Sequence, residues 1–141
     1  MKKLRNLLPH ALFVLYLAVL LRLTVFRAGM LHNGLFSGRM NLPVFTAYGQ
    51  LLSWGSYFHA FYLFVGNIVW FIPLGWYLKR EQHSFFAALL TGFVFSFCIE
   101  ALQFILGCGV SETDDLVLNT LGAGCGALLY LLLHPRSQRS A

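Results

Sequence analysis

Apolar residues fill four long stretches of the chain, and few polar residues interrupt them. The stretches cover about residues 9–26, 57–78, 84–106 and 115–134. At a rise of about 1.5 Å per residue, 18 helical residues reach far enough to cross the hydrocarbon core of a bilayer. The pattern therefore predicts an all-α membrane protein whose single domain, residues 1–141, contains four transmembrane helices.

The segment between the first two helices is both apolar and rich in residues that interrupt helices. Five glycines and Pro43 lie between residues 27 and 56, which excludes a continuous spanning helix. An apolar segment of this kind is expected on the outer bilayer surface or folded back onto the helices. Residues 45–54 predict a short interfacial helix, with Trp54 and Tyr57 at the membrane–water boundary.

Composition supports a membrane protein and argues against a nucleic-acid partner. Of the 141 residues, 58% are apolar and 11% are charged, whereas in soluble domains about a quarter of the residues are charged. The net charge is +5 at pH 7, but the basic residues lie between the apolar stretches rather than on one face. Such a distribution sets membrane topology and does not form a nucleic-acid footprint.

The basic residues predict the orientation of the four helices. Those expected on one side of the membrane are Lys2, Lys3, Arg5, Lys79, Arg80, Arg136 and Arg139. The positive-inside rule makes this side cytoplasmic, so both termini are expected in the cytoplasm and the acidic turn at residues 112–115 outside. The first stretch contains Arg22 and lacks a small-residue cleavage site, so we expect it to be retained rather than removed as a signal peptide.

Polar residues recur at helical spacing in the third and fourth stretches. One face of the third holds Ser96, Glu100, Gln103 and Gly107, and one face of the fourth holds Asp115, Asn119, Gly122 and Gly126. A carboxylate within a membrane helix is costly unless it is paired or hydrated, so these residues are candidates for function. The GxxxG pair in the fourth stretch allows another helix to approach closely. Since the connecting turn is short, we expect these two helices to be antiparallel neighbours whose polar faces meet.

Counting residues from the helix ends compares the depths of the polar side chains. Arg22, Glu100 and Asn119 are expected about 6–9 Å below the outer surface. Asn67 is expected deeper, near the midplane. A structural role is open for each of them, because Glu100 can pair with Arg22, and asparagines can join helices by hydrogen bonds.

Asp114 and Asp115 have a structural interpretation of their own. They stand at the start of the last apolar stretch, where carboxylates satisfy free backbone N–H groups and suit the helix dipole. The occurrence of several polar groups at one depth nevertheless favours a shared binding site over separate structural roles.

Four sequence motifs add a family resemblance. They are NLPVF at 41–45, GNIVWFIPLG at 66–75, IEALQ at 99–103 and TDDLVLNTLGAGCG at 113–126. In order and spacing they resemble the VanZ family of small bacterial membrane proteins, named for a teicoplanin-resistance protein. The resemblance implies a helical protein of the bacterial cytoplasmic membrane that faces outward and is associated with glycopeptide resistance, and it implies no particular reaction.

Two positions depart from the pattern of that family. No arginine precedes the acidic pair, since residues 107–111 read Gly-Cys-Gly-Val-Ser. In the first motif Pro43 stands one place earlier than usual relative to Phe45. The first departure weakens any role that needs a cation beside Asp114.

The residues and the resemblance together favour a binding protein. The candidate ligand-binding residues are Arg22, Asn41, Asn67, Glu100, Gln103, Asp114, Asp115 and Asn119. We expect them to contact an envelope component, a lipid headgroup or lipid-linked precursor, or a glycopeptide, and so to contribute to teicoplanin resistance.

Two alternatives remain open at this point. One is a Mg²⁺-dependent enzyme acting on a lipid-linked phosphate, since Glu100, Asp114, Asp115 and Asn119 offer the oxygen ligands that Mg²⁺ prefers. The other is an assembly partner or homo-oligomer that uses the GxxxG face and binds no ligand. The sequence leaves the cofactor undecided and favours binding over catalysis.

Overall fold

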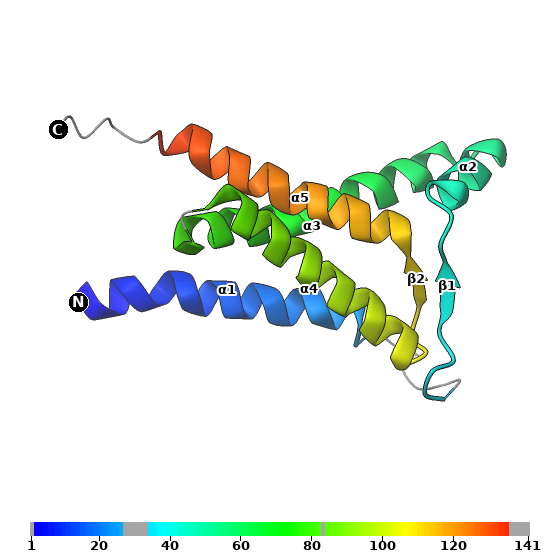
Figure 1. Ribbon diagram of the computed structural model, residues 1–141, viewed down its shortest axis with the longest axis horizontal. Coiled ribbons are helices and arrows are strands. Elements are labelled where there is room, and N and C mark those ends of the chain that lie inside the picture. The colour runs from blue at the N-terminus through cyan, green and yellow to red at the C-terminus, as the bar shows by residue number, and fades with distance from the viewer. Residues whose placement is uncertain (1, 27–33, 83, 136–141) are drawn as a thin grey trace. The chain divides into compact units, whose positions relative to one another are not determined.

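The computed structural model describes residues 2–26, 34–82 and 84–135, and places five helices and two short strands within them (Figure 1). In chain order they are α1 (Lys2–Thr24), β1 (Arg39–Asn41), α2 (Thr46–Ser53), α3 (Tyr57–Gln82), α4 (Phe85–Ile105), β2 (Val110–Glu112) and α5 (Thr113–Leu133). Four helices, α1, α3, α4 and α5, are long and apolar enough to cross a membrane. The prediction of a nearly all-α protein with four membrane helices is therefore confirmed.

Most helix bounds lie close to the predicted ones, and the exceptions have physical reasons. α1 begins at Lys2 and continues through Pro9, because strong helix formers flank that proline: lysine, arginine and leucine before it, alanine and leucine after it. The short helix predicted at 45–54 is present as α2. The two three-residue strands were not predicted, because they are too short to show an alternating pattern. Arg136 and Arg139, used for the topology, lie outside the described residues.

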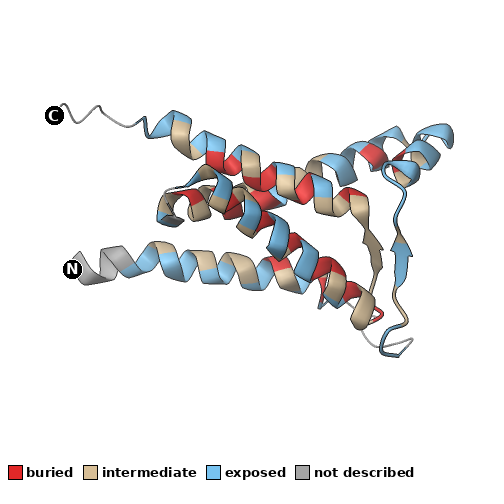
Figure 2. Ribbon diagram, in the orientation of Figure 1, coloured by how far each residue is buried: buried red, intermediate tan, exposed pale blue. Residues whose placement is uncertain are grey.

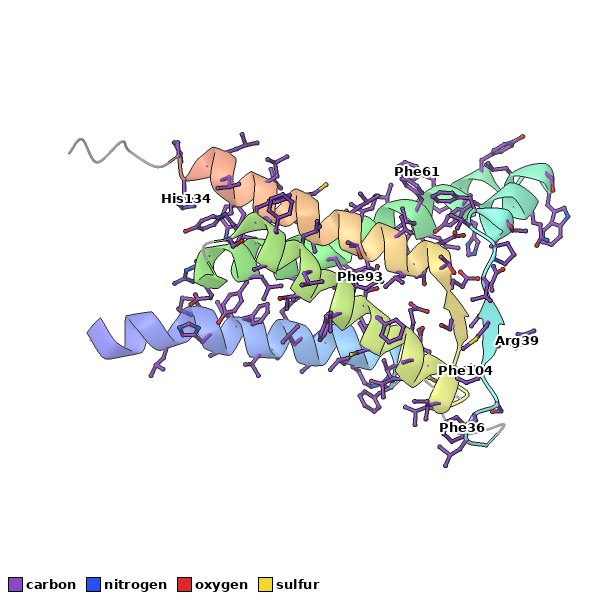
Figure 3. All side chains as sticks on the ribbon, viewed as in Figure 1. Phe36, Arg39, Phe61, Phe93, Phe104 and His134 are labelled. Carbon is purple, nitrogen blue, oxygen red and sulfur yellow. The ribbon has the colours of Figure 1, made fainter. Side chains whose placement is uncertain are left out.

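The chain divides into two compact units, the first formed by Met1–Asn41 and Cys98–Ser111. Within it β1 and β2 pair in a two-stranded sheet. The segment before β1 is held against the end of α4, because the N–H groups of Phe36 and Gly38 donate to the carbonyls of Ile105 and Phe104 at 2.8 and 3.1 Å. Figure 3 shows Phe36 and Phe104 at this end of the unit. A Cβ atom at Gly38 would overlap the backbone of Phe104, so the contact needs glycine.

The second unit, Leu42–Phe97 and Glu112–Ala141, is built on the pair α3 and α5, which lie side by side (Figure 1). Gly122 and Gly126 of α5 lie against the carbonyl groups of Ile68 and Ile72 of α3, where a Cβ atom would overlap the backbone. Both contacts advance by four residues together, so α3 and α5 run in the same direction. The GxxxG pair therefore brings α5 against α3, within one chain.

The first part of α4 and the helix α2 complete the second unit. The rings of Phe71 and Phe95 join α3 to α4 with centroids 6.3 Å apart. Tyr48 of α2 packs with Ala60 and Leu118, which belong to α3 and α5. Figure 2 shows the buried residues of α5 as a stripe along one side of the helix. This stripe contains both small residues and polar residues, and the polar ones form the candidate site.

Candidate functional site

The buried carboxylate of Asp114 lies in the first turn of α5 and is only 1% exposed. Its Oδ1 atom accepts a hydrogen bond of 2.6 Å from the backbone N–H of Phe45, the residue directly before α2. Phe45 holds a left-handed backbone conformation, with φ 57°. The Oδ2 atom of Asp114 has no hydrogen-bond partner among the residues that the structure describes. One half of this carboxylate is thus buried without compensation, which costs free energy.

Asp115 lies next to Asn67 of α3, whose Nδ2 atom donates to Oδ1 of Asp115 at 2.5 Å. Asn67 was expected deeper in the membrane than Arg22, Glu100 and Asn119, and this depth stays a prediction. α3 begins well before Asn67, whereas α5 begins immediately before Asp114. The first turns of α3 consequently extend beyond the start of α5.

Asn119 lies one turn below Asp115 and connects α5 to α4. Its Nδ2 atom donates to the hydroxyl of Ser96 at 3.0 Å, and both residues are buried. The expectation that the polar faces of these two helices meet is confirmed at this pair. The Oδ1 atom of Asn119 is buried and, within the described part of the chain, accepts no hydrogen bond.

Tyr48 is the residue of this site that sequence reasoning missed. It lies in α2, is 8% exposed, and packs edge-on against Phe64 with ring centroids 6.0 Å apart. Burial, and then the charges of Asp115, Asp114 and Glu112, raise the pKa of Tyr48 to about 12, while a hydrogen bond with the Asn67 side chain acts in the opposite direction. The phenol therefore keeps its proton at neutral pH. The one signal in the sequence that could have identified Tyr48 is its polar hydroxyl group within an otherwise apolar segment.

The capping interpretation of the acidic pair is only partly supported. The residue before α5 is Glu112, and its side chain makes no capping hydrogen bond. Asp114 and Asp115 lie in the first turn, where negative charge suits the helix dipole. The two hydrogen bonds described above, however, join them to Phe45 and Asn67, outside α5. The pair thus connects α5 to the segment before α2 and to α3.

The other four predicted residues, Arg22, Asn41, Glu100 and Gln103, belong to the first unit. Glu100 and Gln103 are 5% and 7% exposed, and the Gln103 amide donates to the Thr24 carbonyl at 3.3 Å. The guanidinium of Arg22 donates to the carbonyl of Phe26. Asn41 ends β1 and is half-buried. Pairing of Arg22 with Glu100 stays a prediction.

The residues brought together in the second unit are thus Asn67, Asp114, Asp115 and Asn119, with Tyr48 added; we call these five residues the α5 cluster. It offers two carboxylates, two amides and a phenol, of which Asp114, Asn119 and Tyr48 are buried and Asn67 and Asp115 half-buried. Among the described residues, no three His, Cys, Asp or Glu side chains are grouped so that they could hold a metal ion. The arrangement suits a ligand that carries positive charge, because carboxylates form strong charge-assisted hydrogen bonds with cations.

Comparison with known proteins covers almost the whole chain. The family model of VanZ/LLP1 matches residues 13–134. Protein VanZ from Enterococcus faecium is 29% identical over 130 residues, which is 89% of this chain and 74% of that protein. No solved structure matches. Since this match covers most of the chain, including α3, α4, α5 and the α5 cluster, the chain belongs to the VanZ/LLP1 family of membrane proteins.

Proposed function

We propose that this protein binds an envelope component at the α5 cluster and so contributes to resistance against glycopeptides such as teicoplanin. The observation that carries the proposal is the buried carboxylate of Asp114, which has one oxygen without a hydrogen-bond partner in the described part of the chain. Asp115 adds a second carboxylate beside it. Packing alone does not require a buried carboxylate oxygen that no described residue hydrogen-bonds, so this oxygen favours a role beyond packing.

The chemistry of the cluster favours a ligand with a cationic group. Three carboxylates, Glu112, Asp114 and Asp115, fall within four positions of the chain. The Asn67 amide orients Asp115, and the Tyr48 phenol remains a hydrogen-bond donor at neutral pH. A lipid headgroup, a lipid-linked precursor or a glycopeptide that carries an amine would complete these hydrogen bonds.

The proposal includes a location and an orientation. We propose that the protein lies in the bacterial cytoplasmic membrane with both termini inside. Lys79 and Arg80 in the last turn of α3, and further basic residues near both termini, support this orientation. The α5 cluster then lies near the outer surface, within reach of envelope components. A reporter fused after Ala141 should be cytoplasmic, and one inserted at the exposed Gly55 should be outside. The opposite pattern would overturn the orientation.

The decisive experiment replaces Asp115 by asparagine in a strain whose resistance depends on this protein. Asp115→Asn keeps an oxygen that accepts from Asn67 but removes the charge, so we expect normal protein levels and loss of resistance. Glu81→Gln is the matched control, because it removes an exposed carboxylate at the far end of α3, where Glu81 pairs with Arg80 at 3.6 Å. Wild-type resistance from a well-expressed Asp115→Asn protein would contradict the proposal.

The assembly alternative loses its main support. Gly122 and Gly126 already contact α3 of the same chain, so the GxxxG face is not available for a second copy. An assembly role would therefore need a different surface.

A further inference from the structure

An apolar cavity of about 480 Å³, open to the surface of the protein, lies between α2 and the first turns of α3. Its walls include Phe45, Gly49 and Leu52 on one side and Ala60, Phe61 and Phe64 on the other. Figure 3 shows Phe61 on the first turns of α3. The helix α2 packs on these turns, and its Tyr48 lies in one buried cluster with Ala60 of α3. The cavity volume falls within the range of about 300–1,000 Å³ that is typical of small-molecule sites.

Phe45 and Tyr48 connect the cavity to the α5 cluster. The side chain of Phe45 lines the cavity, while its N–H group donates to Asp114. Tyr48 lines the cavity, and its phenol lies close enough to the Asp114 and Asp115 carboxylates to feel their charge. The apolar space therefore ends at a wall shared with two carboxylates. Asp114, buried beside this wall, has one oxygen to which no residue that the structure describes donates a hydrogen bond.

The surroundings indicate what can enter this space. Tyr57, Phe58 and Phe61 at the start of α3 are 66%, 82% and 65% exposed, and they begin a candidate membrane span. Exposed aromatic side chains at the end of a span contact the interfacial region of the bilayer. Lipid molecules are thus the nearest source of apolar groups. The acidic end of the cavity selects among them by charge, since an amine complements two carboxylates and a neutral or anionic headgroup does not.

We propose that the cavity holds one hydrocarbon chain of a membrane lipid whose headgroup amine binds the carboxylates of Asp114 and Asp115. The proposal rests on the proposed function and names the ligand class for that site. The hydrocarbon chain contacts the apolar walls, and the amine donates to the unpartnered Oδ2 atom of Asp114 and to Asp115. The Phe45–Tyr48 wall determines where the chain ends and the headgroup begins.

The test uses the full chain in bilayer discs made of phosphatidylcholine, which contributes no primary amine. Two photoreactive probes with the same alkyl chain are added, one ending in a primary amine and one in a hydroxyl group. Mass spectrometry then locates the labelled residues. We expect labelling within residues 45–64, with the amine probe labelling about tenfold more at equal concentration, as a charge-assisted hydrogen bond would produce.

Two variants separate the cavity from the charges. Gly49 lies in α2 with nothing within 4 Å of its Cβ position, so Gly49→Leu fills the cavity without a backbone clash. We expect it to lower labelling by both probes at least about tenfold. Gly66→Leu is the matched control, because Gly66 also has open space in a helix but does not line the cavity. Asp115→Asn should abolish the preference for the amine and leave labelling by the alcohol unchanged.

Each alternative outcome overturns a defined part of the proposal. Equal labelling of the wild type by both probes would show that the amine is not recognised. Undiminished labelling of Gly49→Leu would show that the hydrocarbon chain does not occupy the cavity. Cross-links from the cavity to a second copy of the chain would identify a protein occupant instead of a lipid.

The resistance assay separates this inference from the proposed function. Loss of resistance in Asp115→Asn without amine-selective labelling of the wild type would leave the proposed function standing and overturn the lipid site. Amine-selective labelling of the wild type together with full resistance in Asp115→Asn would support the lipid site and overturn the proposed function.

Discussion

The start and the middle of α5 are both buried, but against different kinds of neighbours. At the start, Asp114 and Asn119 are 1% and 5% exposed, and their hydrogen-bond partners come from Phe45 and Ser96. In the middle, Gly122 and Gly126 lie directly against the backbone of α3. The middle of the helix therefore holds the second unit together by close packing. The start carries two buried oxygens, on Asp114 and Asn119, that accept no hydrogen bond from the described residues, and packing does not require them. Function and stability can therefore be separated along one helix.

The largest loss of stability is expected from substitutions of the α5 glycines that contact α3. In Gly122→Leu the side chain overlaps the Ile68 carbonyl, and overpacking of this kind destabilises by about 3 kcal/mol or more. Thermal unfolding of the purified protein in detergent should show a much lower melting temperature. Gly66→Leu, at a helical glycine with open space around it, should melt like the wild type. Equal melting of the two variants would mean that the close contact of α3 and α5 is not needed.

A smaller change in the free energy of unfolding, measurable only at high pH, is expected at Tyr48. Because its pKa is about 12 in the folded protein and about 10 in an unfolded chain, the folded state holds this proton more tightly. The resulting stabilisation is fully present below pH 10 and is lost as the pH rises towards 12, to an extent of about 2 kcal/mol. Tyr48→Phe cannot titrate, so its stability should fall less between pH 10 and pH 12. Parallel pH profiles for the two proteins would contradict the buried phenol.

Asn119→Leu tests the polar end of α5 at its deepest residue. The change removes one hydrogen bond to Ser96 and also one buried oxygen without a partner, so we expect a loss of only about 1 kcal/mol. Expression should stay near normal while resistance is lost. If resistance persists, Asn119 serves only to join α4 and α5.

The smallest change in stability is expected at the acidic pair itself. In Asp114→Asn and Asp115→Asn, the retained oxygen still accepts from Phe45 or Asn67, so unfolding free energies should change by less than about 1 kcal/mol. Resistance and amine-selective labelling should nevertheless disappear in Asp115→Asn. Strong destabilisation by either change, measured as in the glycine variants, would place the pair with the packing residues of α5.

Long-range apolar patterning explains which features of the fold were predictable. Each spanning helix satisfies its own backbone hydrogen bonds, so its position follows from local sequence alone. The helices α1, α3, α4 and α5 were therefore identified from their apolar residues, and α2 from the shorter apolar segment around it. The strands β1 and β2 were missed, because a strand of three residues is too short to show an alternating pattern. In addition, the two strands that pair are far apart in the chain.

In the candidate site, too, the residues were predictable from the sequence, whereas their contacts were not. The polar identity of Asp114, Asp115, Asn119 and Asn67 is unusual for membrane helices, and this made them candidates before any contact was known. Their partners were a different matter. The contact between Asn67 and Asp115 depends on how far α3 extends beyond α5, and that offset is determined by the glycine contacts between the two helices.

Only the tertiary structure decided which helices contact each other and how far they are offset along their axes. It also decided which groups lie beside the polar residues. Burial of Tyr48 against Ala60 and Leu118, and the cavity between α2 and α3, both result from the packing of three separate elements. A single sequence records the preference of each helix for its own conformation and for lipid. It does not record the offset between helices, because that is the joint result of side-chain shapes on several surfaces that become neighbours only on folding.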